Sequence, residues 1–219
     1  MNPISRSVLR RLSVHCETFQ SDYPLPNFNV IPNFLASELV RGVLPACQTA
    51  RYRTFCGYSH PNSTVVKSHF CDPNEEDTYI TVHERPIHII KALNRLHALF
   101  KKQETVDALS ALTGLTLTNV GLHVLTSWQP GSFLELHTDY DSRGAARLIL
   151  SLSLTRRWRS EYGGTAVYAW KGLNRSVRIT PHCNTAVLFV PFSGSNHWVE
   201  QVSPHAPHRQ RFTWTIFFR

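Results

Sequence analysis

The sequence predicts a mainly β fold of the α+β class, in which helices of the N-terminal half buttress a jelly-roll core formed by the C-terminal half. Short segments rich in β-branched, aromatic and leucine residues follow one another from residue 120 to the end of the chain. Gly, Pro, Asn, Asp and Ser separate these segments, as they separate the strands of a sandwich or barrel. Helical patterns with one apolar face lie before residue 118.

We expect one domain over residues 1–219, with a mainly helical scaffold and loops over 1–118 and the β core over 119–219. A β-rich domain of this length can bury a full core without being split. No apolar run approaches the roughly 20 residues that a membrane-spanning helix needs. The five cysteines show no C-x-x-C spacing, and their odd number does not suit a secreted disulfide framework. We therefore expect a reducing, cytoplasmic environment.

Three helices are expected in the first half. Apolar residues recur at helical spacing over Ala36–Ala50 and Ile87–Lys101, and a shorter helix over Glu104–Thr113 should end at Gly114. We interpret their apolar stripes as faces that pack on the core. Residues Arg51–Glu84 have mixed composition and no clear period, which indicates a long irregular segment of the kind that forms substrate-binding loops.

Eight strands are expected in the second half, a number that suits a jelly roll with a pocket between its two sheets. They are Val120–Trp128, Ser132–Thr138, Arg147–Leu154, Gly164–Trp170, Ser176–Thr180, Thr185–Phe192, His197–Val202 and Arg211–Phe218.

The motif His137-Thr138-Asp139 ends the second of these strands, and His197 opens the seventh. Residues i and i+2 of an extended segment project to the same side, so His137 and Asp139 can reach one ion together. Two histidines and one carboxylate on one face of a metal leave its opposite face open, as in non-heme Fe(II) oxygenases. A His-x-Asp motif is weak by itself. Its weight comes from its position at the expected mouth of the pocket.

Further motifs of the C-terminal half occur in a fixed order: Trp128-x-Pro130-Gly131, His137-x-Asp139, Arg147-Leu148, Trp158, Gly163-Gly164, Ile179-Thr180-Pro181, Val187-Leu188-Phe189, His197-x-Val199-x-x-Val202 and Arg211-x-Thr213. This order resembles the 2-oxoglutarate and Fe(II)-dependent dioxygenases, and among them the prolyl-hydroxylase-like branch. The resemblance implies a double-stranded β-helix core and iron held by the catalytic residues His137, Asp139 and His197. It also implies 2-oxoglutarate as a co-substrate that chelates the iron, with O2 as oxidant.

The co-substrate gives Arg211 a role, because a planar guanidinium can bind the far carboxylate of 2-oxoglutarate through two hydrogen bonds. Thr213 faces the same way and could donate to the same carboxylate. Alternatively, Arg211 is a surface cation at the strand end and Arg209, of the same parity, is the anchor. Many relatives have tyrosines where Trp128 and Ser153 stand, so we expect the hydrogen bonds to the co-substrate to differ partly here.

The leading function is hydroxylation of an unactivated C–H bond in an amino-acid, peptide or small biosynthetic substrate, with 2-oxoglutarate converted to succinate and CO2. One alternative is a tailoring oxygenase that desaturates or cyclises a natural-product intermediate. Another is a non-catalytic, cupin-like binding protein. The sequence does not name the substrate.

The formal net charge of +8 raises the question of a nucleic-acid partner. The last strand lacks the second arginine of the branch that dealkylates nucleic acid bases, which argues against such a substrate. Arg156, Arg157 and Arg159 cluster at a strand end, where they face either an acidic or carrier-bound substrate or solvent alone. We interpret His205 and His208 as loop residues rather than metal ligands.

Overall fold

The computed structural model describes residues 3–5, 27–50, 52–58, 65–71, 87–140, 146–208 and 211–219. No helix in these ranges is long and apolar enough to cross a membrane. Three α-helices are present there, α2 (Ser37–Thr49), α4 (Ile87–Phe100) and α5 (Gln103–Thr113), together with the 3-10 helix η1 (Ser160–Tyr162). The strands are β1 (Phe28–Pro32), β2 (Arg53–Tyr58), β3 (Val65–Cys71), β4 (Val120–Ser127), β5 (Phe133–His137), β6 (Leu148–Ser153), β7 (Ala166–Trp170), β8 (Ser176–Ile179), β9 (Thr185–Phe189), β10 (Ser195–Val199) and β11 (Phe212–Phe218).

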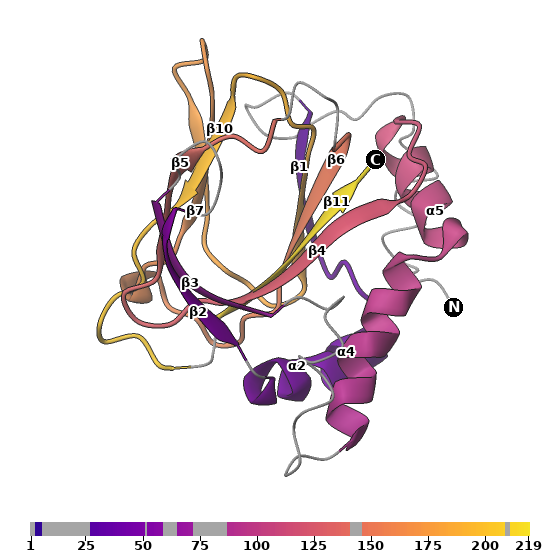
Figure 1. The fold of residues 1–219 in the computed structure, drawn as a ribbon. Coiled ribbons are helices and arrows are strands. Elements are labelled where there is room, and N and C mark those ends of the chain that lie inside the picture. Colours follow the sequence, from indigo (N-terminus) through magenta and orange to yellow (C-terminus); the bar gives the residue numbers. More distant parts are fainter. Residues whose placement is uncertain are drawn as a thin grey trace.

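The strands form one antiparallel sheet that folds back on itself, in the order β1-β9-β6-β11-β4-β3-β5-β10-β7-β8, with β2 paired to β3. Figure 1 shows two walls that face each other. We call β1, β9, β6, β11 and β4 the helix-backed wall, because the helices cover its outer side, and β5, β10, β7 and β8 the opposite wall. β3 pairs with both β4 and β5 and so joins the walls. This is a mainly β jelly-roll core buttressed by helices.

All eight strands and all three helices expected from the sequence are present, with ends that differ by a few residues. α5 ends at Gly114, whose left-handed backbone (φ 68°) suits glycine. The expectation for Arg51–Glu84 was wrong in part, because residues 53–58 and 65–71 form the hairpin β2–β3. Strand pairing overrides weak local preference, and the short pattern around Gly57 gave no period to detect. The rest of that segment, except Tyr52, lies outside the described residues.

The helix-backed wall has two different faces. Along β6, Leu148, Leu150 and Leu152 are fully buried and belong to the core that the helices cover. Ser151 and Ser153 alternate with these leucines and therefore point to the interior between the walls. β11 continues the pattern, with Phe212, Trp214, Ile216 and Phe218 toward the helices and Thr213, Thr215 and Phe217 toward the interior.

Candidate metal and co-substrate site

His137, Asp139 and His197 meet on the opposite wall, where the end of β5 lies beside the middle of β10. His137 on β5 and His197 on β10 are register partners, and Asp139 follows β5 by two residues. Asp139 Oδ1 lies 3.6 Å from His137 Nε2, and its Oδ2 lies 3.3 Å from His197 Nε2. All three potential ligand atoms lie within 4.8 Å of one another. This is the donor set and the spacing of a facial iron site.

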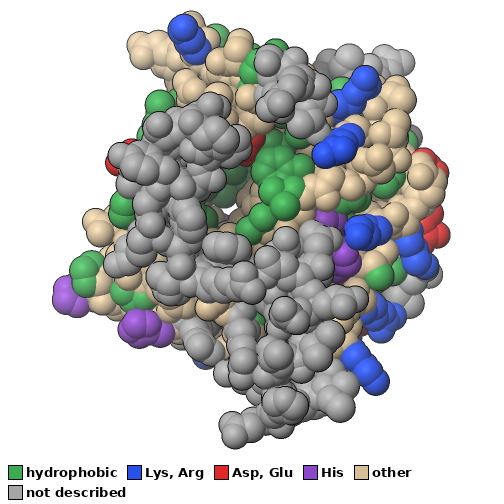
Figure 2. All heavy atoms as spheres, in the orientation of Figure 1, with side chains coloured by type: hydrophobic (Ala, Val, Ile, Leu, Met, Phe, Trp, Pro, Cys, Tyr) green, Lys and Arg blue, Asp and Glu red, His purple; other side chains and the backbone are tan. Residues whose placement is uncertain are grey.

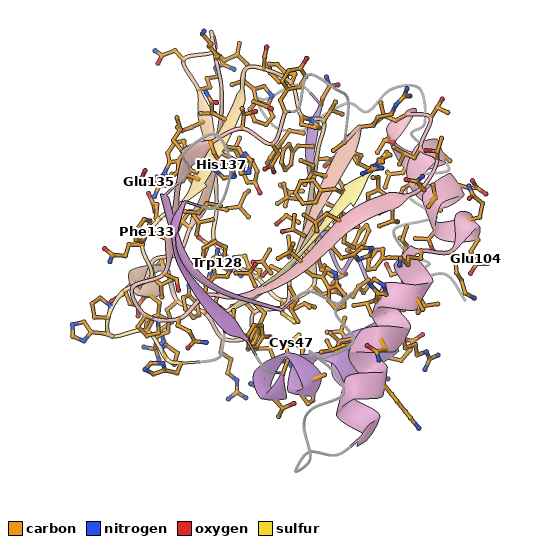
Figure 3. The ribbon with its side chains drawn as sticks, in the orientation of Figure 1. Cys47, Glu104, Trp128, Phe133, Glu135 and His137 are labelled. Atoms are coloured by element: carbon orange, nitrogen blue, oxygen red, sulfur yellow. The ribbon has the colours of Figure 1, made fainter. Side chains whose placement is uncertain are left out.

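In Figure 3, His137 and Trp128 lie on the side of β5 that faces the helix-backed wall, whereas Phe133 and Glu135 lie on the other side. The three candidate ligands are largely buried, with side-chain exposures of 14%, 16% and 12% for His137, Asp139 and His197. An ion held there would still be reachable from solvent. No other group of three His, Cys, Asp or Glu side chains with metal-ligand spacing occurs among the described residues.

The ring of His137 is oriented by the backbone. Its Nδ1 lies 2.8 Å from the carbonyl oxygen of Glu135, which accepts a hydrogen bond from Nδ1–H in the neutral ring. That tautomer leaves the Nε2 lone pair free on the side of Asp139. The arrangement is the usual one for a metal-ligating histidine, whose second nitrogen donates to a carbonyl or carboxylate.

Arg211 is a buried cation, only 3% exposed, which excludes its interpretation as a surface residue. Its Nε and Nη1 have no hydrogen-bond partner in the described part of the chain. Burial lowers the pKa of Arg211 to about 9. The guanidinium carbon lies 4.7 Å from the ring centroid of Trp128. A buried guanidinium with unfilled donors is costly until an anion pairs with it, so this position fits a carboxylate.

Gly164 provides the space for Arg211. A Cβ on Gly164 would lie 2.9 Å from Arg211 Nε, and the backbone of Gly164 is left-handed (φ 66°). Both facts favour glycine at this position. The role of Gly164 cannot be predicted from the sequence, because the contact joins segments far apart in the chain. Arg209, the alternative anchor, lies outside the described residues.

The residues around Arg211 carry hydroxyl groups toward the same interior. Trp128 Nε1 donates a hydrogen bond to Thr213 Oγ1 at 3.1 Å, which leaves the Thr213 hydroxyl proton available to another acceptor. Ser153 pairs with Thr213 in the sheet, and its buried Oγ has no partner among the described residues. Trp128 therefore contacts Arg211 and orients Thr213. It does so through its ring and its Nε1–H, without the hydroxyl group of the tyrosine that many relatives have at this position.

The remaining histidine and arginine candidates lie apart from the three ligands. His205 and His208 are exposed, and His208 Nδ1 lies 3.2 Å from Gln129 Oε1. Trp158, next to the arginine cluster, packs in the same apolar cluster as Trp128. The exposed Arg159 lies 3.6 Å from Glu161. The arginine cluster is thus near the Arg211 end of the interior rather than beside the metal ligands.

Comparison with known proteins agrees with this geometry. Residues 122–219 match the family model described as the 2OG-Fe(II) oxygenase superfamily. The matched residues include the three candidate metal ligands and Arg211. The chain is thus an Fe(II)- and 2-oxoglutarate-dependent dioxygenase, and the cofactors of this superfamily are Fe(II), 2-oxoglutarate and O2. A search of curated proteins gave no match.

Solved structures share the fold over nearly the whole chain. A prolyl hydroxylase from Trichoplax adhaerens, in complex with a peptide fragment of the oxygen degradation domain of hypoxia inducible factor, has 18% identity and a TM-score of 0.66. The alignment covers 97% of this chain and 90% of that one. A Pseudomonas putida prolyl-4-hydroxylase has 17% identity and a TM-score of 0.63, with 97% of both chains covered.

Proposed function

We propose that this dioxygenase hydroxylates an unactivated C–H bond of an amino-acid residue, most simply a prolyl residue in a peptide. One observation carries the proposal. Two groups face the interior between the walls: the three converging side chains of His137, Asp139 and His197, and the buried guanidinium of Arg211, whose unfilled donors can pair with an anion. Two sites of this kind match the two ends of 2-oxoglutarate, whose keto-acid end binds the metal and whose far end is a carboxylate.

The residues have separable tasks. His137, Asp139 and His197 would hold the iron, which together with 2-oxoglutarate supplies the oxidising power that places one oxygen atom of O2 on the substrate. Arg211 would bind the far carboxylate, and the hydroxyl groups of Thr213 and Ser153 would complete its hydrogen bonds. Trp128, Val199 and Val202 line one apolar cluster near this end, which keeps water away from the ion pair.

The rim of the site favours an apolar substrate group. Figure 2 shows hydrophobic side chains beside the hollow in the middle of this face. Tyr140, which follows Asp139 directly, is 39% exposed. The pyrrolidine ring of a prolyl residue is such a group, and the structural neighbours described above are prolyl hydroxylases.

A product screen tests this proposal. The purified protein is incubated with Fe(II), 2-oxoglutarate and O2 together with proline-containing peptides, matched peptides in which alanine replaces proline, and free amino acids. We expect succinate and a product heavier by one oxygen atom, formed with the proline peptides and dependent on 2-oxoglutarate. A product lighter by two hydrogen atoms would establish desaturation instead. Oxidation of free small molecules but not of peptides would contradict the peptide assignment.

A further inference from the structure

His197 is held differently from His137. Its Nδ1 is buried and has no hydrogen-bond partner among the residues that the structure describes. The second nitrogen of a metal-ligating histidine is normally fixed by a hydrogen bond, which sets the plane of the ring. In this chain, ring contacts surround His197 instead. Its centroid lies 4.0 Å from that of His137, 5.2 Å from that of Phe189 and 5.6 Å from that of Tyr168.

Tyr168 makes the most regular of these contacts. It lies on β7 opposite His197 in the strand register, and the two rings are nearly parallel, with an interplanar angle of 13°. Phe189 meets both Tyr168 and His197 edge-on, at 63° in each case. Tyr168 is itself 3% exposed. Stacking on such a fixed ring removes rotational freedom from the imidazole of His197.

The hydroxyl of Tyr168 reaches across to the helix-backed wall, where it hydrogen-bonds Ser151 on β6. An aromatic residue needed only to fill space would be cheaper as phenylalanine, because a buried hydroxyl requires a partner.

We propose that Tyr168 is a positioning residue for iron binding: its ring sets the plane of His197, and the hydrogen bond to Ser151 fixes the ring of Tyr168. This inference rests on the proposed role of His197 as an iron ligand. Stacking on Tyr168 would orient the ring of His197, as the hydrogen bond to the Glu135 carbonyl orients the ring of His137. The sequence gave no signal for it, because a tyrosine in a strand is typical of any packed sheet.

Metal binding tests the inference directly. Co(II) is titrated into the metal-free full-length protein, and its visible absorption reports both the affinity and the geometry of the site. Tyr168→Ile removes the stacked ring and should weaken Co(II) binding on the order of tenfold or more, as loss of an orienting partner does at other metal sites. Tyr168→Phe and Ser151→Ala keep the ring and break the same hydrogen bond, so each should cause a smaller loss of similar size.

Tyr52 offers a matched control on the far side of the helix-backed wall. Its ring stacks on Phe212 at 6.0 Å and 23°, and its hydroxyl donates to the Cys47 carbonyl oxygen at 2.8 Å. Tyr52→Ile should leave Co(II) affinity unchanged even where it lowers the melting temperature. An equal loss of affinity in Tyr52→Ile and Tyr168→Ile would make the effect a general destabilisation and overturn the inference.

Two further outcomes separate this inference from the proposed function. Tight Co(II) binding by Tyr168→Ile, equal to that of the unmodified protein, would overturn the role of Tyr168 and leave the iron site intact. Absence of Co(II) binding in the unmodified protein would contradict the proposed function itself. If Tyr168→Ile does not fold, the pair Tyr168→Phe and Ser151→Ala decides. Their combined variant should be no worse than either alone, and additive losses would contradict a shared hydrogen bond.

Discussion

The two faces of the helix-backed wall differ in what they do for the protein. Toward the helices, strands β6 and β11 present leucine, phenylalanine, tryptophan and isoleucine, all buried. Toward the interior, the same strands present the polar Ser151, Ser153, Thr213 and Thr215 together with the apolar Ile149 and Phe217, and Arg211 lies directly before β11. One sheet thus carries a stabilising face and a binding face, one residue apart along each strand.

The difference has an energetic meaning. Each fully buried leucine or phenylalanine on the outer face contributes about 1.5–3 kcal/mol to folding. The inner face is divided: Ile149, Val187 and Phe189 are buried in an apolar cluster at one end. At the Arg211 end, the buried Ser153 hydroxyl and Arg211 guanidinium keep hydrogen-bonding atoms unfilled. Unfilled buried groups cost stability. The polar groups at the Arg211 end of the inner face are therefore explained by ligand binding rather than by a contribution to the stability of the fold.

The largest effect should come from the metal ligands on the opposite wall. His137→Ala and His197→Ala should each reduce succinate formation to background and weaken Fe(II) binding, because each removes one of three converging donors. Asp139→Gly should likewise end hydroxylation. His205→Ala and His208→Ala serve as controls and should keep normal turnover. Full activity in His197→Ala would remove this residue from the metal. Activity in Asp139→Gly would direct attention to Asp141, outside the described residues.

Next in size is the loss of the carboxylate anchor. Arg211→Lys keeps a charge but replaces a planar fork with a single point donor. Arg211→Ala removes the charge as well. Losing one partner of a buried charged pair costs on the order of 2–5 kcal/mol, so the KM for 2-oxoglutarate should rise tenfold or much more in Arg211→Ala, and substantially but by less in Arg211→Lys. Fe(II) affinity should stay near normal. Steady-state kinetics with varied 2-oxoglutarate measures this, with Arg209→Ala as control. A greater loss in Arg209→Ala than in Arg211→Ala would move the anchor to Arg209.

Two neighbours on β6 compare the faces directly. Leu152→Ala should lower the free energy of unfolding by about 2–5 kcal/mol, because it leaves a cavity in the helix-covered core. Ser153→Ala should change stability little and raise the KM for 2-oxoglutarate severalfold. Chemical denaturation and kinetics on both variants measure the contrast. Equal destabilisation by the two substitutions would show that the inner face is as much a part of the core as the outer one.

The last prediction leaves activity at neutral pH unchanged and concerns His123, a fully buried side chain of β4 beside Trp214. His123 Nδ1 accepts a hydrogen bond from Trp214 Nε1 at 3.3 Å. Burial, with His97 and Lys101 nearby, lowers the pKa of His123 from 6.5 to about 3. His123 therefore takes up a proton below pH 6.5 in the unfolded chain, but only below about pH 3 in the folded chain. Stability should fall as the pH is lowered through this window, by at most about 1.4 kcal/mol per pH unit.

His123→Asn keeps a hydrogen-bond acceptor for Trp214 without a titrating ring. Unfolding by urea at several pH values between 3 and 6.5 should show a shallower pH dependence in this variant than in the unmodified protein. An identical slope in both proteins would mean that other groups account for the acid sensitivity.

The strands and the candidate metal ligands could be predicted from the sequence, because local patterns encode them. Alternation along β6 and β11 placed the strands, and the spacing of His137 and Asp139 gave the candidate ligands before any contact was known. The role of Gly164 and the stack of Tyr168 on His197 were missed, because both depend on strand pairing between distant segments. The hairpin β2–β3 was missed for a similar reason, since its place between β4 and β5 comes from the closing of the sheet rather than from its own residues.

The measurement that tests the binding face most directly is the thermal unfolding of Arg211→Met, with Mn(II) present and with or without 2-oxoglutarate. Replacing a buried, unpaired guanidinium by an apolar side chain of similar length should raise stability by about 1–4 kcal/mol without the co-substrate. Saturating 2-oxoglutarate should stabilise the unmodified protein, as any ligand of the folded state does, and should stabilise the variant far less. A variant that is less stable than the unmodified protein, yet gains as much from 2-oxoglutarate, would contradict the assignment of Arg211 as the buried anchor of the co-substrate.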